Sequence, residues 1–93
     1  MRLSDEQIEK IKEYAGLFLT PREIACLMDL PIGEFTEVLQ DPLHPAATAY
    51  LKGKAQSKYE IRKKVIDLAK KGSPQAENLA DKYIEEQRLY DDE

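Results

Sequence analysis

The chain has 93 residues, of which 42 % are hydrophobic and 34 % are charged, and its formal net charge is -4. This length allows one domain with a modest core, and the composition is typical of a soluble helical protein with wide solvated faces. No apolar run is long enough to span a bilayer, and the opening Met-Arg-Leu-Ser-Asp-Glu lacks the apolar core of a signal peptide, so we expect a cytoplasmic protein.

Apolar residues recur at helical spacing along the whole chain, and no segment shows the period-two alternation of a strand. The sequence therefore predicts an all-α fold. The first helix is predicted from about Ser4 to Gly16, because Ser4 is a good N-cap and Gln7 follows three residues later. Its expected apolar face consists of Ile8, Ile11 and Ala15.

Residues 19–39 predict two short helices joined by a tight turn, which is the outline of a helix-turn-helix. The run from Thr20 to Glu23 fits a capping box, with proline in the first helical position. In a DNA-reading unit of this shape the second helix faces the major groove. The expected exposed positions of that helix are Gly33, Glu34, Thr36, Glu37 and Gln40.

Two of these side chains are chemically suited to base edges, namely Thr36 and Gln40. The same helix carries Glu34 and Glu37 and has no Lys or Arg. Because phosphates line the groove, the two acids disfavour direct base readout by this helix.

Residues 41–45, Asp-Pro-Leu-His-Pro, are predicted to form a rigid connector, because proline disfavours helix at the residue before it. A long helix is then expected from about Pro45 to Lys71, and Gly53 within it permits a bend. Apolar residues of its second half share one face, and they are Ile61, Val65, Leu68 and Ala69.

Gly72, Ser73 and Pro74 suit the end of one helix and the start of the next, which is expected to run to about Leu89. So short a connection requires an antiparallel hairpin or a sharp elbow, and we expect the hairpin. The sequence thus predicts a single domain over residues 1–93. A helix-turn-helix-like unit occupies residues 1–41, and a helical hairpin occupies residues 45–89.

Charge is segregated along the chain. Residues 1–51 carry four basic and nine acidic side chains, residues 52–71 carry eight and two, and residues 72–93 carry two and seven. Such asymmetry indicates an anionic partner or an acidic neighbouring subunit. Lys54, Lys58 and Arg62 follow at i+4 spacing and form one basic ridge, as phosphate contacts require. A solvated face with internal pairs such as Lys63 with Asp67 is the alternative.

The sequence has few cysteine or histidine side chains that could serve as nucleophiles, bases or metal ligands. Cys26 is the only cysteine and is expected to be a buried structural thiol, while His44, the only histidine, lies between two prolines. The four glycines are scattered, so no nucleotide-binding loop is present. We therefore expect a protein that is not an enzyme, with no catalytic residues, no metal site and no cofactor.

Four segments carry a family resemblance. They are Leu-Thr-Pro-Arg-Glu-Ile-Ala-Cys-Leu-Met at 19–28, Asp-Pro-Leu-His-Pro-Ala at 41–46, Ala-Tyr-Leu-Lys-Gly-Lys-Ala at 49–55 with Glu-Ile-Arg-Lys-Lys-Val-Ile-Asp-Leu-Ala-Lys-Lys-Gly at 60–72, and Ser-Pro-Gln-Ala-Glu-Asn-Leu-Ala at 73–80. From about residue 4 to residue 88 the chain resembles small phage or prophage proteins of the terminase small subunit type. Those proteins are the DNA-recognition component of viral genome packaging.

In that family an N-terminal helix-turn-helix binds packaging-site DNA, and a helical hairpin drives ring-shaped oligomers that present the DNA to the large ATPase subunit. The resemblance implies that Thr20, Arg22, Thr36 and Gln40 fall in the DNA-binding unit. It also implies that residues 50–89 form the oligomerisation hairpin. The chain departs from the family at Asp29, where a glycine is common, and in its acidic second short helix.

The first functional hypothesis is a non-enzymatic protein of phage DNA packaging in a bacterial host, which binds double-stranded DNA as a homo-oligomer. Phosphate contacts would come mainly from Lys52, Lys54, Lys58, Arg62 and Lys63. One alternative is an oligomerisation module without DNA binding, in which acidic helices of one subunit dock on the basic helix of the next. Another is a phage transcription regulator.

Overall fold

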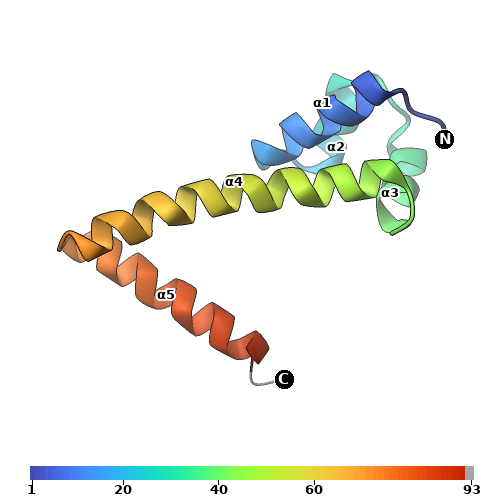
Figure 1. Cartoon of the computed structure of the whole chain (residues 1–93). Helices are drawn as coiled ribbons and strands as arrows, with labels where there is room; N and C mark the ends of the chain where they lie inside the picture. The colour runs from blue at the N-terminus through green and yellow to red at the C-terminus, as the bar shows by residue number, and fades with distance from the viewer. Residues whose placement is uncertain (92–93) are drawn as a thin grey trace. The chain divides into compact units, whose positions relative to one another are not determined.

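The structure, a computed structural model, describes residues 1–91 and shows five helices and no strand in that range (Figure 1). The all-α prediction is confirmed. In chain order the helices are α1 (Asp5–Gly16), α2 (Pro21–Leu27), α3 (Ile32–Gln40), α4 (Pro45–Lys70) and α5 (Pro74–Asp91).

Side-chain caps fix the starts of α1 and α2. The Ser4 hydroxyl accepts from the Gln7 amide at 3.1 Å, and the Gln7 side chain accepts from the Ser4 amide at 2.8 Å. Thr20 and Glu23 exchange the same two bonds at 3.2 and 2.9 Å, and proline occupies the first turn of α2. Both capping boxes were predicted from sequence and are confirmed, and each satisfies amides that the helix itself leaves without partners.

Left-handed residues end three of the helices. Phe18 after α1, Asp29 after α2 and Gly72 after α4 have φ values of 62°, 54° and 95°. After each of them the next amide bonds back to a carbonyl in the last turn, as from Leu30 to Ala25 at 2.9 Å. This arrangement is a common helix stop, and glycine adopts it without strain whereas Phe and Asp do not. The chain therefore reverses sharply between α2 and α3 at a residue other than glycine.

The chain divides into two compact units, and the boundary between them lies inside α4, between Lys58 and Tyr59. The first half of α4 thus belongs with α1, α2 and α3 in the N-terminal unit. The second half of α4 and α5 form the C-terminal unit. The structural boundary therefore lies further along the chain than the 41–45 connector that separates the two parts in the sequence.

The N-terminal unit has a continuous apolar core. Its fully buried large side chains come from three different helices and are Ile11, Ile24 and Phe35. Ala25, Val38 and Ala46 complete the buried cluster, so that α1, α2, α3 and the start of α4 share one core. Partly buried residues surround this cluster, and they are Leu3, Tyr14, Leu19, Met28, Leu30, Leu39 and Tyr50.

Small residues allow α1 and α4 to cross closely within the N-terminal unit. Gly53 is buried, and a Cβ added there would overlap the backbone carbonyl of Lys12. A Cβ added at Gly16 would lie 2.9 Å from the Ser57 hydroxyl oxygen. Gly53 therefore serves the approach of two helices, which is a different role from the bend suggested by its place in a helical sequence.

Only alanines are buried in the described part of the C-terminal unit, and these are Ala76 and Ala80. After the left-handed Gly72, the Ser73 hydroxyl accepts from the Ala76 amide at 3.4 Å and helps to start α5. Figure 1 shows α5 running back from this turn at an open angle to the second half of α4. Arg62 of α4 contacts two residues of α5, because its guanidinium pairs with Glu86 and lies over the Tyr83 ring.

Candidate nucleic-acid and assembly surfaces

Two residues predicted to contact DNA lie at the start of α2, and they are the N-cap Thr20 and Arg22 in the first turn. The Thr20 hydroxyl already accepts from the Glu23 amide, so it serves the helix cap. Hydrogen bonds from Thr20 to the Glu23 carboxylate also lower the pKa of that carboxyl below its usual value of 4.5. Arg22 lies exposed in the first turn of α2, where its guanidinium can reach an anionic group.

The outer face of α3 is acidic, as the sequence predicts. Gly33, Glu34, Glu37 and Gln40 are all exposed, which confirms their expected positions. Thr36 is half-buried, and its hydroxyl donates to the Ile32 carbonyl at 2.8 Å. Of the two side chains suited to base edges, only Gln40 therefore remains fully exposed.

Lysines of the first half of α4 form the basic surface of the N-terminal unit. Lys52 and Lys58 are exposed, and Lys54 is half-buried with its ammonium nitrogen 5.0 Å from the centroid of the Tyr50 ring. This cation–π contact holds Lys54 in place while leaving its charge available. We call Lys52, Lys54 and Lys58 the α4 basic surface.

Arg62 and Lys63 belong to the C-terminal unit. The Arg62 guanidinium donates to the Glu86 carboxylate at 3.0 Å and lies 4.3 Å from the centroid of the Tyr83 ring. Its charge is therefore largely engaged within the chain. Lys63 is exposed and its ammonium lies 6.0 Å from the centroid of the Tyr59 ring. The ridge proposed from the i+4 spacing is thus divided between a basic surface in one unit and an intrachain ion pair in the other.

A surface that the sequence does not reveal lies on the C-terminal unit. Ile61 and Leu68 of α4 are 50 % and 52 % exposed, although helical spacing places both on a predicted packing face, and Ile84 of α5 is 49 % exposed. Leu79 and Tyr59 are also exposed. We call these five residues the C-terminal apolar surface. The periodicity shows that these residues share a face, but periodicity does not show whether that face has a partner.

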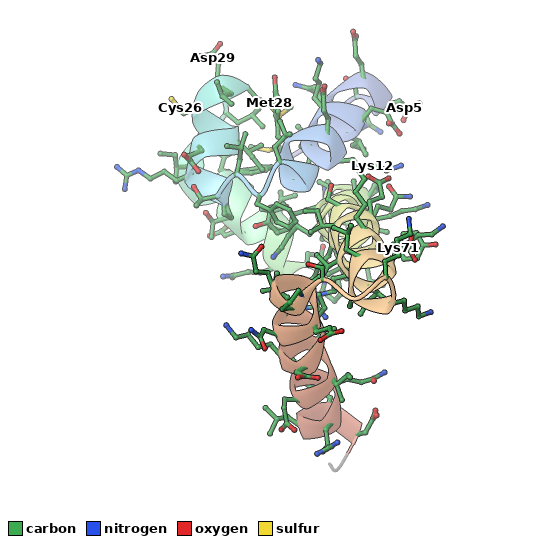
Figure 2. All side chains as sticks on the ribbon, turned by 90° about the vertical axis from the view of Figure 1, so that its left-hand side faces the viewer. Asp5, Lys12, Cys26, Met28, Asp29 and Lys71 are labelled. Carbon is green, nitrogen blue, oxygen red and sulfur yellow. The ribbon has the colours of Figure 1, made fainter. Side chains whose placement is uncertain are left out.

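The sequence-based expectation of a buried thiol is wrong, because Cys26 is exposed. Figure 2 shows Cys26 and the neighbouring Asp29 on the outer side of the α2 end of the molecule. Ile24 and Ala25 form the buried side of this seven-residue helix, and the next position along turns away from the core. Within residues 1–91, no three His, Cys, Asp or Glu side chains are grouped so that they could hold a metal ion.

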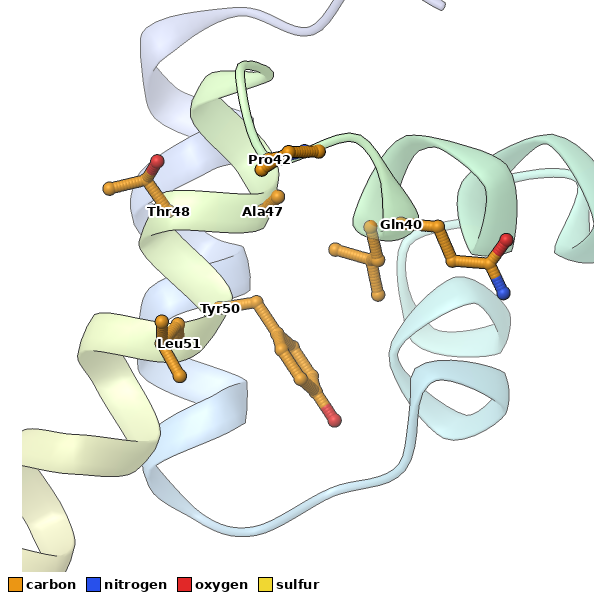
Figure 3. Close-up of a pocket in the computed structure, with 7 residues that line it drawn as sticks. Gln40, Pro42, Ala47, Thr48, Tyr50 and Leu51 are labelled. Atoms are coloured by element: carbon orange, nitrogen blue, oxygen red, sulfur yellow. The ribbon is translucent and has the colours of Figure 1, made fainter. Parts of the chain in front are cut away.

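A hollow of about 410 Å³ lies beside the connector, between the end of α3 and the start of α4. Figure 3 shows Ala47 and Tyr50 of α4 facing Pro42 and the end of α3 that carries Gln40. The seven lining residues are Leu39, Gln40, Pro42, Ala47, Thr48, Tyr50 and Leu51. We call this hollow the α3–α4 groove. Five of its residues are apolar or aromatic, and only Gln40 and Thr48 are neutral polar residues.

No protein-family model, no curated protein and no solved structure matches this chain. In the part of the chain that the structure describes, none of the helices combines the length and the apolar character needed to cross a membrane.

Proposed function

We propose that this chain is a non-enzymatic DNA-binding and assembly protein, which acts in the manner of the small terminase subunit in phage DNA packaging. In this proposal copies associate through the C-terminal unit. The N-terminal unit holds double-stranded DNA through the α4 basic surface. The assembled copies would present that DNA to a large terminase ATPase inside a bacterial host.

The assembly part of the proposal rests on one observation, which is that the described C-terminal unit has no large buried side chain. Two helices that bury only Ala76 and Ala80 gain little from packing on each other. The same helices leave Leu68 and Ile84 about half exposed. An exposed apolar surface of this kind on a soluble protein is typical of an interaction site.

Charge complementarity favours a second copy as the partner. Residues 59–71 carry five basic and two acidic side chains, whereas α5 carries two basic and five acidic ones. In a two-fold arrangement, the second half of α4 in one copy meets α5 of the other and the same contact occurs twice. The Arg62–Glu86 pair shows that these two charge types already meet within one chain.

Light scattering after size-exclusion chromatography tests the assembly. We expect the parent chain to be oligomeric at micromolar concentration and a Leu68→Gln/Ile84→Gln variant to be monomeric, because each substitution removes apolar area from the C-terminal apolar surface. The control is Leu17→Gln, which removes a leucine that is 66 % exposed in the N-terminal unit and should leave the oligomer intact. A parent chain that stays monomeric at every concentration would refute this part of the proposal.

DNA binding rests on the α4 basic surface, beside a helix pair with the outline of a helix-turn-helix. Because α3 presents acids, the affinity would come from phosphate contacts of Lys52, Lys54 and Lys58 together with Arg22 of α2. Such binding is strongly salt-dependent and only weakly dependent on sequence. In this proposal Gln40, which is exposed at the end of α3, makes the base contact.

Fluorescence anisotropy of a labelled duplex, measured over a range of salt concentrations, tests DNA binding. We expect Lys52→Gln/Lys54→Gln to weaken binding and to reduce the slope of log affinity against log salt by about 2, one for each lost phosphate contact. Lys82→Gln removes an exposed lysine of α5 and is the control with an unchanged slope. An equal slope in parent and double variant would remove the α4 basic surface from the proposal.

One observation favours the alternative of an assembly module without DNA binding. Arg62 is engaged by Glu86 and Tyr83, and α3 is acidic, so two of the features expected to face DNA have other partners or the wrong charge. This alternative predicts oligomers that loosen with salt and no DNA binding even at low salt. A transcription regulator would bind DNA in the same assay but would select an operator sequence.

A further inference from the structure

The α3–α4 groove is an open apolar site on the N-terminal unit. Leu51 and Tyr50 both line the groove (Figure 3). Leu51 is 67 % exposed and Tyr50 is half-buried. The hollow is large enough for one or two large side chains. Of its lining residues, only Gln40 takes part in the DNA contacts proposed above, and none takes part in the assembly contact through the C-terminal unit.

Positive charge borders the α4 side of the groove. The Lys54 ammonium lies 5.0 Å from the centroid of the Tyr50 ring, and Lys52 directly follows Leu51. The nearby acid at the connector is Asp41, whose carboxylate already accepts from the Leu43 amide at 3.0 Å. A complementary ligand would therefore present an apolar side chain followed closely by carboxylates.

The last turn of α5 has this chemistry. Leu89 and Tyr90 are 70 % and 71 % exposed, and Asp91 follows them at the end of the helix. Glu85 and Glu86 precede them by about one turn. Arg88 directly precedes Leu89 and pairs with Glu85 at 3.1 Å, and Glu86 pairs with Arg62. The segment is therefore an exposed apolar pair followed directly by Asp91, which matches an apolar groove with lysines on its border.

We propose that the α3–α4 groove binds the last turn of α5 from a second copy of this chain. Leu89 and Tyr90 enter the groove, and Asp91 pairs with Lys54 or Lys52. The Tyr90 hydroxyl can bond to Gln40, which supplies a polar group on the α3 side. Burial of the two apolar side chains provides the affinity, and the charges set the direction in which the helix lies.

This contact is head-to-tail, because it joins different surfaces on the two copies. Repeated contacts of this type close into a ring or continue as a filament. The area is small, so a single contact is weak and becomes effective only when several act together. It is separate from the two-fold contact through the C-terminal apolar surface, and either contact can be absent while the other forms.

A labelled peptide tests the groove directly. The probe is a C-terminally amidated peptide of residues 80–91 with a fluorophore on its N-terminal amine, titrated with the full chain. We expect saturable binding that weakens about tenfold or more when Leu51→Glu is introduced, since an acid then faces both the apolar pair and Asp91. Leu17→Glu adds the same charge at an equally exposed leucine and should bind the peptide like the parent.

A second experiment exchanges the charges of the proposed pair between Lys54 and Asp91. Lys54→Glu should weaken binding of the peptide, and a peptide carrying Asp91→Lys should recover affinity for that variant. Absence of saturable binding, or binding that Leu51→Glu and Lys54→Glu leave unchanged, would overturn the proposal. Because the peptide reports on the groove even if the chain is monomeric, failure here is distinguishable from failure of the assembly through α4 and α5.

A third experiment shows whether the α5 that occupies the groove belongs to a second copy or to the same chain. If a second copy occupies the groove, a Leu89→Ala/Tyr90→Ala chain and the parent bind the peptide equally at concentrations where the parent is monomeric. Tighter peptide binding by that variant under the same dilute conditions would show that each chain fills its own groove. That result would overturn the proposal.

Discussion

The two units of this chain are built from the same kind of helix but bury very different side chains. In the N-terminal unit Ile11, Ile24 and Phe35 are fully buried, whereas the described C-terminal unit buries only Ala76 and Ala80. One helix, α4, contributes to both units. Its first half lies against a core through Ala46, Ala49 and Gly53, and its second half leaves apolar residues in solvent.

This difference indicates where each unit obtains its stability. A core of large side chains from three helices gains several kcal/mol from burial and can fold without a partner. An isolated pair of helices with alanine contacts is marginal in water. We therefore infer that the C-terminal unit is stabilised mainly by association, which links its folding to protein concentration.

The largest expected effect comes from the core of the N-terminal unit. Phe35→Ala removes a fully buried ring and should lower the free energy of unfolding by about 3–5 kcal/mol, measured by urea denaturation. Leu68→Ala in the C-terminal unit should change it by less than about 0.5 kcal/mol in dilute solution, because that leucine is half exposed. Equal costs at the two positions would contradict the contrast between the units.

The next effect concerns the crossing of α1 and α4. Gly53→Ala should destabilise the N-terminal unit by about 1–3 kcal/mol, because the new methyl group overlaps the Lys12 carbonyl and backbone must shift. The matched control is Gly33→Ala in α3, where a Cβ meets nothing within 4 Å. There alanine should stabilise the helix by about 0.5–1 kcal/mol, so thermal unfolding should move in opposite directions for the two variants.

A smaller effect is expected at the turn between α2 and α3. Asp29 has a φ of 54°, a conformation that glycine adopts without strain. Asp29→Gly should therefore stabilise the N-terminal unit, by about 0.5–1 kcal/mol, while Asp29→Ala should not. If the glycine variant unfolds at a lower temperature than the parent, the left-handed turn is not the source of strain in this unit.

The smallest effect depends on pH. Because hydrogen bonds from Thr20 lower the pKa of Glu23 in the folded chain, this carboxylate contributes stability at neutral pH. The contribution is lost as pH falls from the usual value of 4.5 through the lower folded pKa. Glu23→Gln should remove this part of the pH dependence of the melting temperature below about pH 5. An unchanged acid profile in the variant would show that the cap does not hold the carboxylate.

Local features of the fold follow from the sequence because their causes are local. Ser4 with Gln7 and Thr20 with Glu23 form caps from residues only three apart, and Gly72 ends α4 with a left-handed residue. The role of Gly53 does not follow, since it depends on the approach of a helix some forty residues earlier in the chain. Cys26 shows a related limit, because a short helix buries only a narrow strip.

For the candidate surfaces too, the sequence predicts local features but not the contacts between helices. The exposed acids Glu34 and Glu37 lie where helical spacing puts them. Arg62 pairs with Glu86 and lies over Tyr83, and these contacts from another helix do not follow from the spacing along α4. Spacing along one helix identifies which side chains share a face, but the partner of that face depends on tertiary contacts.

Amide hydrogen exchange of the full chain at two protein concentrations tests the central claim most directly. One sample is dilute enough to be monomeric, and the other is concentrated enough for copies to associate. We predict that amides of α1 and α3 are protected equally in both samples, whereas amides of α5 become protected only in the concentrated one. Strong protection of α5 in the monomeric sample would contradict the account, because it would show that the C-terminal unit is stable alone.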